Sequence, residues 1–255
     1  MKNLMIVTDL DGTLLHSDKT VSDYTKDVFL RCRERGIKTA VATARGHPVK
    51  VVPLELFEGQ ILCNGAALVT DGVTRRRAIP YREARPLLLA CAGRGLTVSA
   101  QFGDMHYYSA PETASVWPDI TLWTEVDYAE HEVDTEKVNI AGVTPEDAAF
   151  ITEILPETLY LRVARDGLGM VMRKDATKAQ GAADLAQLWG VPREGIIAFG
   201  DDLNDIDMLT QAGTGVAVRN ALDEVKRAAD CICMSNDEDG VARWIAEMYL
   251  SPLTR

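Results

Sequence analysis

Two short acidic runs contain the side chains best suited to chemistry. Residues 9–13 read DLDGT, and residues 200–205 read GDDLND. Carboxylates this close together repel one another unless a cation neutralises them, and a divalent ion with oxygen ligands is the usual partner. A match to the first run arises by chance in roughly one chain in several hundred of this length. We therefore favour a cation site over a simple polar turn.

A threonine and a lysine are candidates for holding an anion beside these carboxylates. Thr43 ends an apolar run, and its hydroxyl, with N–H groups at the start of a helix, would bind an anion; the alternative is an ordinary N-cap. Lys178 opens a predicted helix, where the helix dipole disfavours a cation. Its position alone favours a solvated surface residue. The second acidic run has an N-cap alternative too, with Asn204 or Asp202 as the capping residue.

Predicted strands precede these candidate residues. Short apolar runs at 4–8, 37–43 and 196–199 end beside Asp9, Thr43 and the second acidic run, and helical spacing follows at 21–35 and 177–189. Strands that alternate with helices imply a parallel sheet, and ligands bind outside the carboxyl ends of its strands. Two acidic clusters at one edge of one sheet favour a shared metal site over separate N-caps.

The pattern changes in the middle of the chain. Residues 96–102 and 105–109 flank Gly103 and Asp104, a two-residue hairpin signal, and a helical stretch at 144–155 alternates with further short strands. Antiparallel strands with their own helices indicate a separate α+β module. We predict that residues 1–80 and 174–255 form an α/β core domain and that residues 81–173 form the inserted module.

Composition narrows the expected partners and compartment. The net charge of −11 argues against nucleic acid or an anionic membrane, because their phosphates would be repelled. No run approaches the roughly 20 apolar residues of a membrane span, and the N-terminal apolar run is too short for an export signal. Five cysteines without a C-x-x-C pair fit a reducing cytoplasm, and Cys231 and Cys233 fit alternation along a buried strand. We expect a cytoplasmic protein, monomeric or weakly homodimeric.

The motifs together resemble those of the haloacid dehalogenase superfamily, specifically its Cof-type (type IIB) sugar-phosphatase-like branch. The resemblance covers nearly the whole chain: DLDGTLL at 9–15, Thr43, ILCNGA at 61–66, Lys178, GDDLNDIDML at 200–209, GVA at 215–217 and NDEDGVA at 236–242. It implies a Rossmann-like parallel sheet core, with the α+β module as a cap that contacts the part of the substrate other than its phosphate.

The resemblance also implies the function, a magnesium-dependent phosphatase acting on small phosphorylated metabolites. Asp9 would attack phosphorus and form an aspartyl-phosphate, and Asp11 would protonate the leaving group, which requires a raised pKa. Mg²⁺ would be held by Asp9, the backbone carbonyl of Asp11, and Asp201. The phosphate-binding residues would be Leu10, Thr43, Ala44, Lys178 and Asn204. The supporting residues would be Asp205, Arg45 and Asn64, with His47 near the same loops.

Some positions depart from the family's pattern. Ala44 replaces the glycine of the usual T-G-R, and Asp175 and Ala179 replace glycines of the usual K-G-x-S-K-G. Because an alanine N–H reaches a phosphate when its φ is negative, we expect the second motif to keep its geometry. His106 and Trp123 are expected in the core of the cap. The alternative functions are a phosphotransferase or phosphomutase of the same fold and, more remotely, a phosphoacceptor signalling module.

Overall fold

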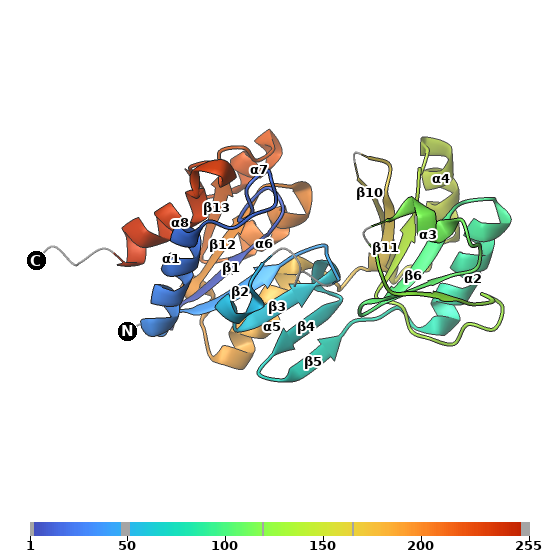
Figure 1. Cartoon of the computed structure of the whole chain (residues 1–255), viewed down its shortest axis with the longest axis horizontal. Helices are drawn as coiled ribbons and strands as arrows, with labels where there is room; N and C mark the ends of the chain where they lie inside the picture. Colours follow the sequence, from blue (N-terminus) through green and yellow to red (C-terminus); the bar gives the residue numbers. More distant parts are fainter. Residues whose placement is uncertain (1–2, 47–51, 119, 165, 251–255) are drawn as a thin grey trace, which may run out of the picture. The chain divides into compact units, whose positions relative to one another are not determined.

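The computed structural model describes residues 3–46, 52–118, 120–164 and 166–250. The chain divides into two compact units, residues 1–75 with 177–255 and residues 76–176 (Figure 1). The inserted module predicted at 81–173 falls inside the second unit. His47 lies outside the described residues. Within the described part of the chain, no helix is both long enough and apolar enough to span a membrane.

The first unit contains an eight-stranded sheet in the order β14-β13-β12-β1-β2-β3-β4-β5. Strands from β14 to β3 pair in parallel, whereas β4 pairs with β3 in antiparallel fashion. The strands are β1 Met5–Thr8, β2 Lys38–Ala42, β3 Gly59–Leu62, β4 Ala67–Thr70, β5 Val73–Arg76, β12 Ile196–Gly200, β13 Thr214–Val218 and β14 Cys231–Cys233. The four residues of β1 are buried, as expected for a strand between parallel neighbours with helices on both faces.

The helices of the first unit are mostly short. They are α1 Asp23–Glu34, α5 Lys178–Trp189, α6 Ile206–Gln211, α7 Asp223–Ala228 and α8 Gly240–Ile245, with a π-helical turn at Ala246–Leu250 and 3₁₀ turns at Leu54–Leu56, Cys63–Gly65, Arg193–Gly195, Leu203–Asp205 and Asn236–Glu238. Thr177 caps α5, because its hydroxyl accepts the N–H of Gln180 at 3.1 Å. The cap fixes where α5 starts and therefore where Lys178 lies.

The second unit contains a six-stranded sheet in the order β10-β11-β9-β6-β7-β8. The strands are β6 Val98–Phe102, β7 Met105–Tyr108, β8 Trp123–Glu125, β9 Lys137–Ile140, β10 Leu159–Val163 and β11 Gly169–Arg173, and the helices are α2 Tyr81–Gly93, α3 Thr113–Val116 and α4 Pro145–Ile154. All paired strands are antiparallel except β7 and β8. Helices α2 and α4 lie on the same face of this sheet (Figure 1).

The predicted fold class is confirmed: a parallel α/β core interrupted by an α+β module. The predicted hairpin exists, as β6 and β7 pair across Gly103 and Asp104. The prediction for Cys231 and Cys233 was only half right, because β14 is an edge strand in which Ile232, between them, is exposed. All five cysteines are free thiols.

Candidate active site at the carboxyl ends of the core strands

Asp9, Lys178 and Asp205 form a buried chain of charges. Asp9 follows β1, and its N–H donates to the carbonyl of Phe199 at 3.0 Å, which extends the pairing of β1 with β12. The Lys178 Nζ donates to Asp9 Oδ1 at 2.6 Å and to Asp205 Oδ1 at 2.7 Å. Lys178 is 2% exposed and Asp205 is fully buried. The interpretation of Lys178 as a solvated surface residue is therefore wrong.

Both carboxylate oxygens of Asp205 accept hydrogen bonds from neighbouring residues. One oxygen accepts from Lys178, and the other accepts the backbone N–H groups of Asp201 at 3.0 Å and Asp202 at 3.1 Å. Asp202 caps the 3₁₀ turn that follows, so the N-cap alternative is correct for that residue. Asp205 thus orients Lys178 and the loop that carries Asp201, and its supporting role in catalysis stays a prediction.

Asp201 follows β12 and faces the loop after β1. Its Oδ1 accepts the hydroxyl of Thr13 at 2.6 Å. Gly12, between Asp11 and Thr13, has a φ of +82°, and a Cβ there would lie 2.5 Å from Asp201 Oδ2. Glycine is required at position 12 both for the backbone conformation and for the approach of this carboxylate.

Three carboxylates converge at this point. Oxygens of Asp9, Asp201 and Asp205 lie within 4.8 Å of one another. One ammonium against three ionised carboxylates leaves two net negative charges, which suits a divalent cation with oxygen ligands. Because the oxygens of Asp205 already bind Lys178 and backbone N–H groups, Asp9 and Asp201 are the better ligands. The donor chemistry therefore fits Mg²⁺.

The pKa values reflect this crowding. Burial raises the pKa of Asp9 well above its ordinary value; Lys178 lowers it, and Asp205 and Asp201 raise it further. Burial likewise raises the pKa of Asp201 to about 6, against the hydrogen bond from Thr13. Burial alone would lower the pKa of Lys178, but the carboxylates of Asp205 and Asp9 outweigh it and raise that pKa. The lysine is therefore charged, and the carboxylates need a further cation in order to be ionised together.

Asp11 lies in a different environment from the one expected. Arg45 donates to both of its oxygens, Nε to Oδ2 at 2.6 Å and Nη2 to Oδ1 at 2.8 Å, and Lys19 Nζ donates to Oδ1 at 2.8 Å. Burial raises the pKa of Asp11, but these hydrogen bonds outweigh it and lower the pKa to about 2. The expectation of a raised pKa is therefore wrong for this conformation, in which Asp11 is an ion-paired carboxylate.

The remaining predicted residues line the same edge of the sheet. Thr43 follows β2, and its hydroxyl accepts the N–H of Arg45 at 3.1 Å. Asn64, after β3, accepts from Nδ2 of Asn204 at 2.9 Å and so joins that edge to the second acidic run. The carbonyl of Leu10 accepts three N–H groups of its own loop, from residues 13–15. Ala44 lies directly between Thr43 and Arg45.

Sequence reasoning missed several residues that shape the loop after β1. Lys19, which pairs with Asp11, has a φ of +67°. Nothing in the sequence around Lys19 indicated this left-handed conformation. Asn220 Nδ2 donates to the carbonyl of Gly12 at 2.7 Å, and Asn236 Nδ2 donates to that of Leu15 at 2.9 Å. The NDEDGVA motif had drawn attention to Asn236. It gave no indication that Asn236 would contact Leu15, which lies 221 residues away in the chain.

Comparison with known proteins fits this geometry. A family model described as haloacid dehalogenase-like hydrolase matches residues 6–245. The chain belongs to this family. The expected family and the expected class of enzyme, a phosphoric monoester hydrolase, are thereby confirmed.

Three matches illustrate the similarity. A 5-amino-6-(5-phospho-D-ribitylamino)uracil phosphatase of Bacillus subtilis is 29% identical over 97% of this chain and 98% of its own length. A pyridoxal phosphate phosphatase of Escherichia coli is 27% identical over 96% of this chain and 98% of its own. The structure of a haloacid dehalogenase-like hydrolase from Bacteroides thetaiotaomicron superposes with a TM-score of 0.85 at 25% identity, covering 97% of this chain and all of that one.

Proposed function

We propose that this hydrolase is a magnesium-dependent phosphatase that removes phosphate from small phosphorylated metabolites through an aspartyl-phosphate on Asp9. The observation that carries the proposal is the meeting of Asp9, Asp201 and Asp205 within 4.8 Å, with the Lys178 ammonium on Asp9. A carboxylate nucleophile that attacks an anion needs cations beside it. Lys178 supplies one, and the charge of the cluster calls for another.

Asp9 is the proposed nucleophile. Its Oδ1 is bound to Lys178, so the ammonium orients the carboxylate and stabilises its ionised form. Attack by a carboxylate oxygen on phosphorus displaces the leaving alkoxide, and water then hydrolyses the aspartyl-phosphate. Thr43, Lys178 and Asn204, with the N–H groups of Leu10 and Ala44, would hold the other phosphate oxygens, where charge develops during transfer.

Asp11 is the proposed acid and base, and its role requires a change of partners. With Arg45 and Lys19 on its oxygens it is ionised and has no proton to give. Arg45 and Lys19 must therefore release the carboxylate, which would allow its pKa to rise. An arriving anionic substrate would compete for the same two cations, so binding and activation of the acid would be linked.

Mg²⁺ would be held by the carboxylates of Asp9 and Asp201 and by the backbone carbonyl of Asp11. When bound, it would neutralise the charge of the cluster and of the phosphate. Asp205 would act through Lys178 and the loop at Asp201 rather than as a ligand.

The substrate class follows from the relatives. The two curated enzymes act, by their names, on a phosphorylated ribityl compound and on pyridoxal phosphate. We therefore propose a small phosphorylated metabolite, sugar-phosphate-like, as the substrate. A phosphotransferase or phosphomutase shares the same intermediate; multiple turnovers of free phosphate would distinguish the hydrolase. A cytoplasmic location and a monomeric or weakly dimeric state remain predictions.

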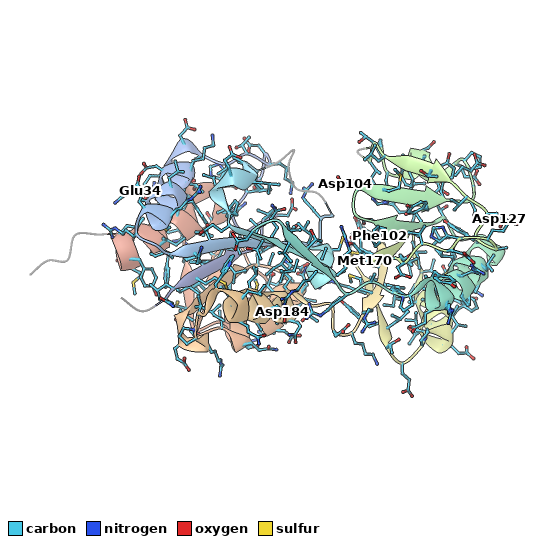
Figure 2. The ribbon with its side chains drawn as sticks, turned by 90° about the horizontal axis from the view of Figure 1, so that it is seen from below. Glu34, Phe102, Asp104, Asp127, Met170 and Asp184 are labelled. Carbon is cyan, nitrogen blue, oxygen red and sulfur yellow. The ribbon has the colours of Figure 1, made fainter. Side chains whose placement is uncertain are left out.

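The test is Asp9→Asn assayed for phosphate release from p-nitrophenyl phosphate with Mg²⁺. We expect kcat to fall by at least about 10³-fold, because the nucleophile is lost. Glu34→Gln, at an exposed carboxylate labelled in Figure 2, is the matched control and should retain full activity. Turnover by Asp9→Asn at the wild-type rate would refute the nucleophile assignment.

A further inference from the structure

The loop after β13 is bonded to both loops that carry the proposed metal ligands. Asn220 Nδ2 donates to the carbonyl of Gly12 at 2.7 Å, and the N–H of Leu222 donates to the carbonyl of Asp201 at 3.0 Å. Gly12 directly follows Asp11, whose backbone carbonyl is one proposed ligand, and Asp201 supplies another. Since β13 pairs with β12 and β12 pairs with β1, these two hydrogen bonds join the ends of three neighbouring strands.

The side-chain amide of Asn220 is fixed at both of its ends. Its Oδ1 accepts the N–H of Asn236 at 3.0 Å, while its Nδ2 donates to Gly12. A backbone N–H can only donate and a carbonyl can only accept, so these two partners select one orientation of the amide. Asn236 is itself held, because it is 5% exposed and its Nδ2 donates to the carbonyl of Leu15 at 2.9 Å. The two asparagines therefore bind the loop after β1 at two points.

Gly12 is a point at which the backbone of this loop gains from being held. Its φ is +82°, and a glycine reaches many more backbone conformations than other residues do. The carbonyl of Leu10 holds the N–H groups of residues 13–15, and the hydroxyl of Thr13 donates to Asp201 at 2.6 Å. The hydrogen bond from Asn220 restricts the peptide between these anchors, and with it the direction of the adjoining Asp11 carbonyl.

The exposure of Asn220 separates this role from packing. Asn220 lies at an exposed position, and its partner Gly12 is 208 residues away in the chain. Water would satisfy an exposed amide equally well, and holding the side chain in one rotamer costs entropy, so such a bond contributes little net stability. What the bond does provide is a defined position for the carbonyl that it binds.

We propose that Asn220 is a positioning residue for Mg²⁺, which keeps the Asp11 carbonyl and Asp201 in the arrangement that binds the ion. The inference rests on the proposed function, since that function calls for the ion. Asn220 acts through the backbone of the loop after β1 rather than as a ligand. Residues that orient the ligands of a metal ion in this way typically change its affinity by 10–100-fold.

Calorimetric titration of Mg²⁺ into the chelator-treated full chain, without substrate, tests the proposal. Asn220→Ala should raise the Kd for Mg²⁺ by about tenfold. Asn220→Asp keeps the shape of the side chain and the acceptor for Asn236, but it turns an oxygen toward the carbonyl of Gly12. This variant should also weaken Mg²⁺ binding, whereas an added negative charge alone would strengthen it.

Asn3→Ala is the matched control. Asn3 is also exposed, and its Nδ2 donates to the carbonyl of Gly190 at 3.1 Å, 187 residues away in the chain. Both alanine variants should lower the Tm of the metal-free first unit by a similar amount, about 2–4 °C. Only Asn220→Ala should change the Kd for Mg²⁺. A merely structural role for Asn220 would lower Tm and leave that Kd unchanged.

Turnover of p-nitrophenyl phosphate gives a second measurement. In Asn220→Ala the Mg²⁺ concentration that gives half the maximal rate should rise about tenfold, and excess Mg²⁺ should restore most of the rate. In Asn3→Ala the rate and its dependence on Mg²⁺ should stay as in the wild type.

The outcomes separate this role from the proposed function. An unchanged Kd in Asn220→Ala, a lower Kd in Asn220→Asp, or an equal loss of affinity in Asn3→Ala would overturn the role of Asn220, and a wild type that hydrolyses monoesters would leave the phosphatase standing. A wild type that binds Mg²⁺ but hydrolyses no monoester would refute the phosphatase, and a tenfold higher Kd in Asn220→Ala would still support the role. A wild type that binds no Mg²⁺ would overturn both the metal site and the role.

Discussion

The Lys178 ammonium is buried between two carboxylates, and its charge follows from their balance. Burial favours the neutral amine, but Asp9 and Asp205 lie at 2.6 and 2.7 Å and favour the ammonium more strongly. A buried ion pair contributes little net stability, since desolvation cancels most of the attraction. What Asp9, Lys178 and Asp205 do provide together is a fixed position for the lysine ammonium beside the proposed nucleophile.

Asp205→Asn tests this view at the level of a single side chain. The amide cannot accept from Lys178 and from the N–H groups of Asp201 and Asp202 together, so an unpaired buried donor results. We expect a loss of about 3 kcal/mol in the free energy of unfolding and at least a tenfold fall in kcat. Urea unfolding and phosphate release are the measurements. Asp207→Asn, at an exposed position of α6, should change neither stability nor kcat. If the two variants behave alike, Asp205 does not hold Lys178 and the loop at Asp201 in position.

At the scale of elements, the site is built by strand ends. β1 lies between β12 and β2, and the residues that follow these three strands are Asp9, Asp201 and Thr43. The turn at Cys63–Gly65 then meets the start of α5, since a Cβ on Gly65 would lie 2.2 Å from the carbonyl of Thr177. Close packing of backbone against backbone thus sets the position of Lys178.

Gly12→Ala tests the close approach between two of these strand-end loops. Gly12 and Gly36 both have positive φ values, +82° and +71°, but only a Cβ at Gly12 meets a neighbour, Asp201. Both alanine variants should lose about 1 kcal/mol of stability from backbone strain. Only Gly12→Ala should also lose activity, by at least about a hundredfold, because Asp201 is displaced. Equal activities of the two variants with p-nitrophenyl phosphate would contradict the role given to Gly12.

The elements that carry the site were the most predictable part of the chain. Strand-end positions of Asp9, Thr43 and Asp201 follow from apolar runs that stop at polar residues. The burial of Lys178 was not predictable from its position, because its partners are Asp9, directly after β1, and Asp205, in a turn 27 residues later. The ion pairs of Asp11 were missed for the same reason: they depend on how loops fold back, not on periodicity.

At the scale of the whole molecule, the proposed metal site would couple Mg²⁺ binding to stability. Ligands that bind only the folded state stabilise it, by about 2.7 kcal/mol at a hundred times Kd. Mg²⁺ should therefore raise the Tm of the unfolding transition that involves the first unit, and chelator should reverse the rise. Asp201→Asn should show no such rise. A wild-type Tm that is indifferent to both Mg²⁺ and chelator would argue against the metal site.

The pH dependence of stability should contain a contribution from the second unit. His106 has its pKa lowered from 6.5 to about 4 in the folded state, so the unfolded chain binds a proton there first as the pH falls. Its contribution is complete above pH 6.5 and is lost towards pH 4. Between pH 7 and pH 4.5 the wild type should lose about 2–3 kcal/mol more than His106→Phe in urea unfolding. Identical losses in the two proteins would mean that His106 titrates normally.

The loop after β1 is held in place by the far end of the chain. Asn236 donates to the carbonyl of Leu15, and Asp239 accepts from His16, Ser22 and Thr25 at 2.6–3.0 Å. The loop that carries the proposed nucleophile and the asparagine that fixes it thus lie 221 residues apart in the chain. We therefore expect that a chain cut before Asn236 would lose activity, although it would still contain every residue of the acidic cluster.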